Sequence, residues 1–140
     1  MNSSTSGSPD LTPTAPAEGG EGRVEQHSLQ ALVVALRVFA QERAWEPFHT
    51  PKNLASALSV EAAELLEHFQ WLTDAQSQTL STDKRDQVAA EAADVFLYLL
   101  QLCDKLNIDL LAAAALKMRV NAAKYPVSLA HGSSKKDSDL

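Results

Sequence analysis

The chain has 140 residues, of which 45% are hydrophobic, and its formal net charge is -6. This length favours a single domain with enough apolar residues to bury a core. The acidic balance argues against nucleic-acid binding, because a surface that follows a phosphate backbone needs an excess of Lys and Arg.

The N-terminal part of the chain divides at residue 28. Residues 1–27 are rich in Ser, Thr, Pro and Gly and have almost no large apolar side chains, which predicts a disordered tail. From Ser28, a residue type that favours the N-cap position, apolar side chains recur at helical spacing as far as about Ala44. This pattern predicts the first helix.

A second helix is predicted after a short irregular segment at 45–50. The pair Thr50-Pro51 combines an N-cap residue with proline at the first helical position. The helical pattern then continues to about Leu72. The polar residues 73–82 are expected to form a loop.

The third helix is expected from about Asp83 to Leu106, and Asp109 is expected to cap a fourth helix that ends near Lys124. Residues 127–140 are expected to be a flexible tail. Because no segment alternates with a period of two, the sequence predicts an all-α fold, with one four-helix domain at 28–126.

Two acidic pairs with identical spacing are the strongest functional signal. Glu61 and Glu64 fall on or beside the apolar arc of the second helix, and Glu91 and Asp94 repeat this layout on the third. Four inward carboxylates need a counter-charge, and oxygen ligands suit a hard cation, Mg²⁺ with Mn²⁺ as a substitute. The alternative is that these acids are solvated on the helix surface.

The fourth helix carries a complementary basic stripe. Lys117, Asn121 and Lys124 are spaced i, i+4, i+7, which places them on one helix face. An ordinary solvated face is the alternative interpretation. Together with a metal site, the stripe fits a metal-chelated polyphosphate, because lysines neutralise phosphate charge and an amide donates hydrogen bonds.

The third helix is apolar on two sides, since Leu97 and Leu100 lie opposite its core arc. Four helices offer one interior, so we expect a homo-oligomer with these leucines in a subunit contact. The single cysteine, Cys103, the absence of a signal-peptide pattern and the absence of a membrane-length apolar run favour a cytoplasmic protein with no membrane partner.

The motifs resemble those of the MazG-like all-α nucleoside triphosphate pyrophosphatases, especially the dCTP pyrophosphatase branch. The matching runs are WEPFHTPKNL at 45–54 and EAAELLEHFQW at 61–71, with further matches at Glu91-x-x-Asp94, Tyr98, Lys117-Met118, Asn121 and Lys124-Tyr125-Pro126. The resemblance covers about residues 28–130. It implies a MazG-like bundle, a dimer or more often a tetramer, that hydrolyses deoxynucleoside triphosphates to monophosphate and pyrophosphate with Mg²⁺.

The resemblance also assigns roles to residues. It implies that the metal ligands and catalytic acids are Glu61, Glu64, Glu91 and Asp94. Residues near the phosphates and sugar would be Lys117, Asn121, Lys124 and Tyr125. The base pocket would be lined by Trp45, Phe48, His49, Trp71 and Tyr98. This division agrees with physical chemistry, because aromatic rings stack on bases and magnesium neutralises phosphate oxygens.

Two positions depart from the family pattern. The wider family often carries a second acid directly before the first motif, where this chain has Val60, and the dCTP-preferring branch also lacks that acid. Leu36 stands where members of that branch carry a histidine, so we expect looser selectivity, with dTTP or dUTP also accepted. A rival hypothesis from another functional class is an oligomeric helical scaffold or nucleotide-binding protein without turnover.

Overall fold

The computed structural model describes residues 28–135. Within that range the regular elements are all helices, which confirms the predicted all-α class. The predicted disordered tail at 1–27 and the last five residues of the predicted C-terminal tail lie outside the described residues.

Six helices follow one another along the described chain. They are α1 (Leu29–Glu42), α2 (Pro51–Glu67), α3 (Asp74–Ser77), α4 (Thr82–Lys105), α5 (Leu110–Lys124) and α6 (Val127–Ala130). The four long ones correspond to the four predicted helices. The short α3 lies in the segment predicted as a loop, and the short α6 lies in the segment predicted as a tail.

The predicted N-caps have the expected geometry. The side chains of Ser28, Thr50 and Asp109 each accept a hydrogen bond from the backbone N–H three residues later. Such bonds satisfy donors that have no partner inside the helix, so each cap fixes where its helix begins.

The prediction that the second helix continues to Leu72 is wrong, because α2 ends at Glu67 with His68 as its C-cap. The chain then turns, and Thr73 starts α3 in a capping box with Gln76. In this box the Thr73 hydroxyl accepts from the Gln76 N–H and the Gln76 side chain accepts from the Thr73 N–H. These reciprocal bonds favour a new helix start over continuation of α2.

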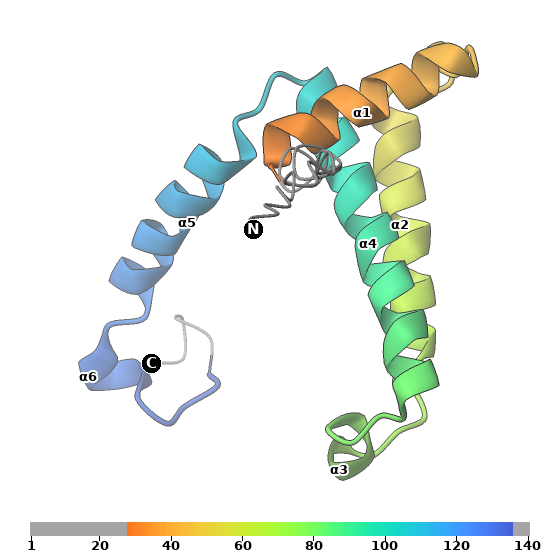
Figure 1. The fold of residues 1–140 in the computed structure, drawn as a ribbon. Helices are drawn as coiled ribbons and strands as arrows, with labels where there is room; N and C mark the ends of the chain where they lie inside the picture. Colours follow the sequence, from red (N-terminus) through yellow and green to blue (C-terminus); the bar gives the residue numbers. More distant parts are fainter. Residues whose placement is uncertain (1–27, 136–140) are drawn as a thin grey trace, which may run out of the picture.

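Helices α2 and α4 lie side by side and run in opposite directions, and α1 crosses the C-terminal half of α4 (Figure 1). The buried hydrophobic residues of the described chain all come from these three helices: Ala40, Leu54, Leu100 and Cys103. The core therefore sits where α1 packs against the α2–α4 pair.

The packing of α1 corrects the expected role of Leu100. This side chain is only 2% exposed within the single chain, because α1 covers the face of α4 that the sequence pattern left without a partner. Leu100 is therefore not available for a subunit contact. Leu97 is half-buried on the same side, beside residues of α1.

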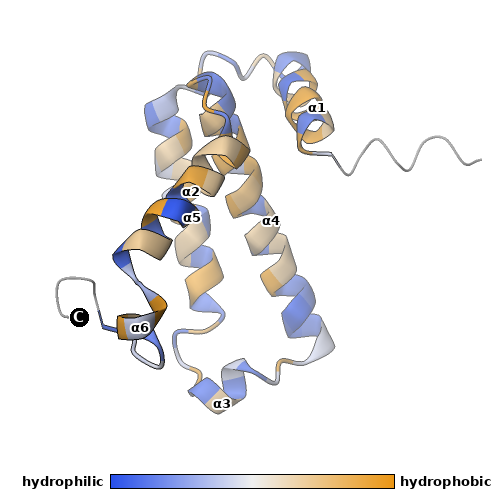
Figure 2. Ribbon diagram, turned by 90° about the vertical axis from the view of Figure 1, so that its left-hand side faces the viewer, coloured by the Kyte–Doolittle hydropathy of each residue, from blue (hydrophilic) through white to orange (hydrophobic). Residues whose placement is uncertain are grey.

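Helix α5 stands apart from α1, α2 and α4 (Figure 1). Its residues 111–124 are all exposed, and apolar positions occur along its length (Figure 2). Leu111 is 64% exposed, Leu116 55% and Met118 73%. None of the helices within residues 28–135 is long and apolar enough to cross a membrane.

Candidate active site

The acidic pairs predicted from the sequence face each other across the α2–α4 interface. Glu61 and Glu64 project from α2 and Glu91 from α4, and one carboxylate oxygen of each lies within 4.8 Å of the others. Glu61 and Glu91 are half-buried, whereas Glu64 is exposed. Asp94 is near enough to act electrostatically on Glu61. The antiparallel pairing of two helices with acids on their inner faces thus creates one cluster.

The surroundings of Glu61 show that the cluster repels additional negative charge. The pKa of Glu61 is raised above its ordinary value, chiefly by partial desolvation and then by the negative charges of Glu64, Asp94 and Glu91. A divalent cation between these oxygens would offset both effects. Because the donors are carboxylate oxygens, the residues fit a hard cation such as Mg²⁺ or Mn²⁺.

His68, which the predicted ligand set does not include, lies beside this cluster. Its Nε2 is 3.9 Å from Oε1 of Glu91, and its side chain is 16% exposed. The spacing Glu64 to His68, four residues along one helical stretch, was the available sequence signal. At this distance the imidazole neighbours the Glu91 carboxylate without a hydrogen bond to it.

A cavity of about 390 Å³ opens next to the acids, and Asp94 belongs to its wall. Apolar side chains of α1 form one side, and Trp45, His49 and residues of α4 form the rest. The lining residues are Leu32, Ala35, Leu36, Phe39, Trp45, His49, Asp94, Leu97, Tyr98 and Gln101. A concave, mostly apolar space with a few polar groups is typical of a small-molecule site. We call it the base cavity.

The aromatic residues of the base cavity contact one another edge to face. The Trp45 ring lies 5.8 Å from the Phe39 ring and 5.9 Å from the His49 ring, measured between centroids. Such contacts hold the indole in place and leave it 44% exposed. A flat, ordered and accessible ring is suited to stacking on a base.

The turn at the end of α1 orients Trp45 toward the base cavity. Ala44 adopts the left-handed conformation with φ 51, and the Trp45 N–H donates to the Ala40 carbonyl over 2.9 Å. The Ala44 N–H donates to the Gln41 carbonyl, which completes a Schellman motif. Farther along, Nδ2 of Asn53 donates to the Phe48 carbonyl over 2.9 Å and fixes the following turn.

Several predicted site residues lie away from the base cavity within the single chain. Phe48 is 68% exposed and Trp71 is 86% exposed. Trp71 follows α2, so the length of that helix, about 25 Å, separates it from Trp45. The predicted phosphate-binding residues lie on or just after the separate helix α5: Lys117, Asn121, Lys124 and Tyr125.

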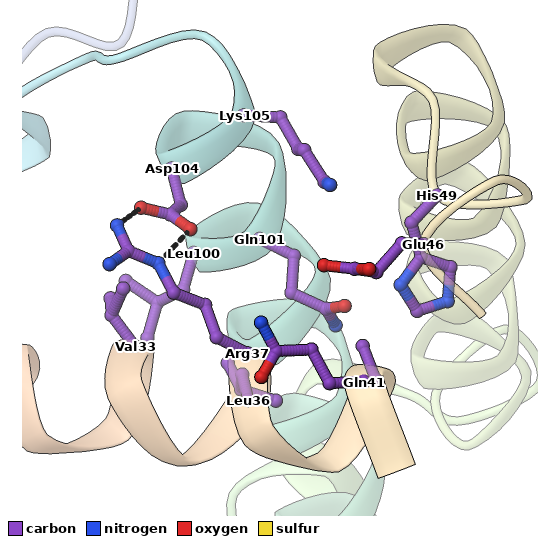
Figure 3. A pocket seen from close by; sticks show the side chains of 11 residues that line it. Val33, Leu36, Arg37, Gln41, Glu46, His49, Leu100, Gln101, Asp104 and Lys105 are labelled. Atoms are coloured by element: carbon purple, nitrogen blue, oxygen red, sulfur yellow. Dashed lines mark hydrogen bonds and ion pairs between the residues drawn. The ribbon is translucent and has the colours of Figure 1, made fainter. Parts of the chain in front are cut away.

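A second, smaller cavity of about 180 Å³ adjoins the base cavity, and Leu36, His49 and Gln101 line both (Figure 3). Arg37 closes one side of it by a bidentate ion pair with Asp104, in which Nε donates to Oδ2 over 2.8 Å. The pKa of Asp104 is lowered, chiefly by the hydrogen bonds from Arg37. The sequence did not single out this pair, because its residues are 67 positions apart.

The sequence is similar to that of known nucleotide hydrolases. Residues 56–140 match the model of the MazG-like family. Over 104 residues the chain is 43% identical to dCTP pyrophosphatase 1 of Homo sapiens and to that of Rattus norvegicus, a match that covers 73% of this chain and 61% of each relative. The chain therefore spans about three fifths of the length of these curated relatives.

A solved structure is similar in fold and sequence. The crystal structure of a pyrophosphatase from Archaeoglobus fulgidus aligns with a TM-score of 0.60 and 42% identity. The alignment covers 71% of this chain and 94% of the archaeal chain.

Proposed function

The chain belongs to the MazG-like family, and from this premise we propose that it is a Mg²⁺-dependent nucleoside triphosphate pyrophosphatase. The substrates are dCTP and 5-modified dCTP, the products are the monophosphate and pyrophosphate, and the role is housecleaning of the nucleotide pool in the cytoplasm. The observation that carries the proposal is the position of Asp94, which lines the base cavity and is near enough to the close carboxylates of Glu61, Glu64 and Glu91 to act electrostatically on Glu61.

In this proposal Glu61, Glu64, Glu91 and Asp94 would hold Mg²⁺, which supplies charge neutralisation for the phosphate oxygens. One carboxylate of the cluster orients a water molecule and accepts its proton as the water attacks phosphorus in line. The base cavity holds the base against Trp45 and thereby fixes where the triphosphate meets the acids.

The predicted phosphate- and sugar-binding residues on or just after α5 contact the nucleotide only when subunits associate. Exposed apolar side chains along α5, such as Leu111 and Met118, need a partner in water, and the single chain provides none within residues 28–135. We propose a homo-oligomer, dimer or tetramer, in which α5 packs on a second copy. This arrangement presents Lys117, Asn121, Lys124 and Tyr125 to the phosphates and sugar of a nucleotide bound to the neighbouring subunit.

The proposal is tested by a substrate profile with the full-length chain. Normal and 5-modified deoxynucleoside triphosphates are incubated one at a time with the protein and Mg²⁺, and kcat/KM for pyrophosphate release is measured with and without a chelator. We expect the highest kcat/KM for dCTP and 5-methyl-dCTP and no release with chelator. Higher values for purine triphosphates would contradict the assignment, and binding without turnover would support the rival scaffold hypothesis.

A further inference from the structure

One polar side chain of the base cavity has no role in the proposed function so far. Gln101 lies on α4, is half-buried and lines both adjoining cavities. Its Nε2 donates to the Leu97 carbonyl over 3.5 Å, which is a long and weak bond. Among the described residues its Oε1 has no hydrogen-bond partner. The carboxamide is therefore available to a molecule that enters the cavity.

The position of Gln101 along α4 relates it to the acids. Asp94, Tyr98 and Gln101 are spaced i, i+4, i+7, so they form one stripe on the helix, and all three line the base cavity. The stripe rises about 10 Å along the axis from Asp94 to Gln101. This length is on the scale of a nucleoside, so a nucleotide with phosphates at Asp94 extends its base toward Gln101.

Outside the α1 side of the base cavity, the side chains that can hydrogen-bond belong to Trp45, His49 and α4. The α1 side of the cavity is formed by Leu32, Ala35, Leu36 and Phe39, which offer no side-chain hydrogen bonds. Figure 3, which draws the smaller adjoining cavity, shows Gln101 extending from α4 into the space between α1 and the segment that carries His49. Gln101 is the single carboxamide in the wall of the base cavity.

We propose that Gln101 is the residue that reads the polar edge of a pyrimidine base, and this inference rests on the proposed function. Cytosine presents an amino donor at position 4 and an acceptor at N3, whereas thymine and uracil present an acceptor at position 4 and a donor at N3. A carboxamide carries one acceptor beside donors, so a half-turn about its last torsion matches either pattern. The substrate class is then pyrimidine deoxynucleoside triphosphates of both the 4-amino and the 4-oxo kind.

The test compares substrates that differ only at the edge of the base. Gln101→Leu removes the carboxamide at similar size, and kcat and KM are measured for dCTP, dTTP and the analogue whose base is 2-pyrimidinone, which lacks a substituent at position 4. We expect kcat/KM to fall about tenfold to hundredfold for dCTP and dTTP, mainly through KM, the scale of a lost bidentate contact. The analogue keeps the N3 acceptor and lacks only the partner at position 4, so its kcat/KM should fall less than that for dCTP.

A matched control is Gln87→Leu, which makes the same change at an exposed position on the same helix and should leave all three values as in the wild type. An equal fall for all three substrates in Gln101→Leu would show a structural role and overturn the inference. If that variant does not fold, the wild-type protein decides: the inference requires at least about tenfold preference for dCTP over the analogue, and equal values overturn it. Absence of hydrolysis in the wild type contradicts the proposed function alone, and the same comparison is then made on dissociation constants.

Discussion

At the scale of single residues, Glu61 is the most informative side chain of the acidic cluster. It is half-buried, and three other carboxylates raise its pKa in addition to its own desolvation. Such an arrangement is unfavourable for the folded protein unless a cation is bound there. The cluster is therefore better explained by a metal ligand set than by solvated surface acids.

This explanation predicts the effect of Glu61→Gln, which keeps the side-chain volume but removes one anion. We expect kcat to fall by roughly two orders of magnitude or more, the scale associated with loss of preorganised electrostatic stabilisation. Steady-state kinetics at saturating Mg²⁺ measure this. The control is Glu67→Gln, an exposed acid on the same helix outside the group of three close carboxylates. Equal losses in the two variants would refute the assignment.

Trp45 carries the second prediction at this scale. Its ring is held edge-on by Phe39 and His49 and remains accessible, so it is ready to stack on a base. Because a stacked ring contributes about 1 to 3 kcal/mol per base, Trp45→Ala should raise the KM for dCTP about fivefold to hundredfold. Trp45→Phe keeps a flat ring and should restore most of the affinity. An unchanged KM in the alanine variant would show that the base binds elsewhere.

Sequence periodicity was sufficient to bring together Glu61, Glu64 and Glu91, because positions on one helix face follow from 100° per residue. It could not find Phe39 or Gln101 as cavity residues. Each lies on a helix whose pattern is compatible with ordinary packing, and their meeting depends on how α1 crosses α4. That crossing is a tertiary property, which local sequence does not encode.

At the scale of elements, the ion pair between Arg37 and Asp104 joins α1 to α4 beside the two cavities. Asp104 has a lowered pKa in the folded protein. Its contribution to the free energy of unfolding is therefore fully present above the ordinary carboxylate range and is lost as the pH falls through the lowered value. The docking of α1 should weaken in acid for this reason.

The corresponding prediction concerns Asp104→Asn. The variant should be less stable than the wild type near neutral pH, and the difference in free energy of unfolding should shrink as the pH falls through the pKa of Asp104. Denaturant unfolding over a series of pH values measures it. Asp86→Asn, at an exposed position of the same helix, serves as the control. A difference that stays constant with pH would contradict the role given to this pair.

The limits of the helices were predictable where a side chain marks them. Ser28, Thr50 and Asp109 were recognised as N-caps, and the structure confirms all three. The end of α2 was not, since the apolar residues Phe69 and Leu72 continue the helical spacing although the backbone turns. The capping box of Thr73 and Gln76 was the overlooked signal.

At the scale of the whole molecule, α5 is the feature that a single chain does not explain. The sequence predicted this helix. It also predicted a subunit contact that includes Leu100, which α1 buries within the single chain. A hydrophobic pattern identifies the residues that must be buried, but it does not show whether the same chain or a second copy buries them. We base the proposed association on the exposed apolar residues of α5.

We predict that the protein forms a homo-oligomer at micromolar concentration. Light scattering coupled to size-exclusion chromatography measures the mass that checks this. Leu116→Glu places a charge on α5 and should shift the measured mass toward that of the monomer. The same variant should lose activity, because the lysines of α5 then no longer reach a neighbouring subunit. A wild-type protein of monomeric mass with full activity would contradict this arrangement.

The most direct test of the central claim is to follow one equivalent of dCTP with the wild-type protein and Mg²⁺ by phosphorus NMR. If the acidic cluster and the base cavity place the triphosphate as proposed, dCMP and pyrophosphate should appear in equal amounts, with no dCDP at any time and no reaction in the presence of a chelator. Appearance of dCDP with inorganic phosphate as the first products would place cleavage at the terminal phosphate and contradict the account.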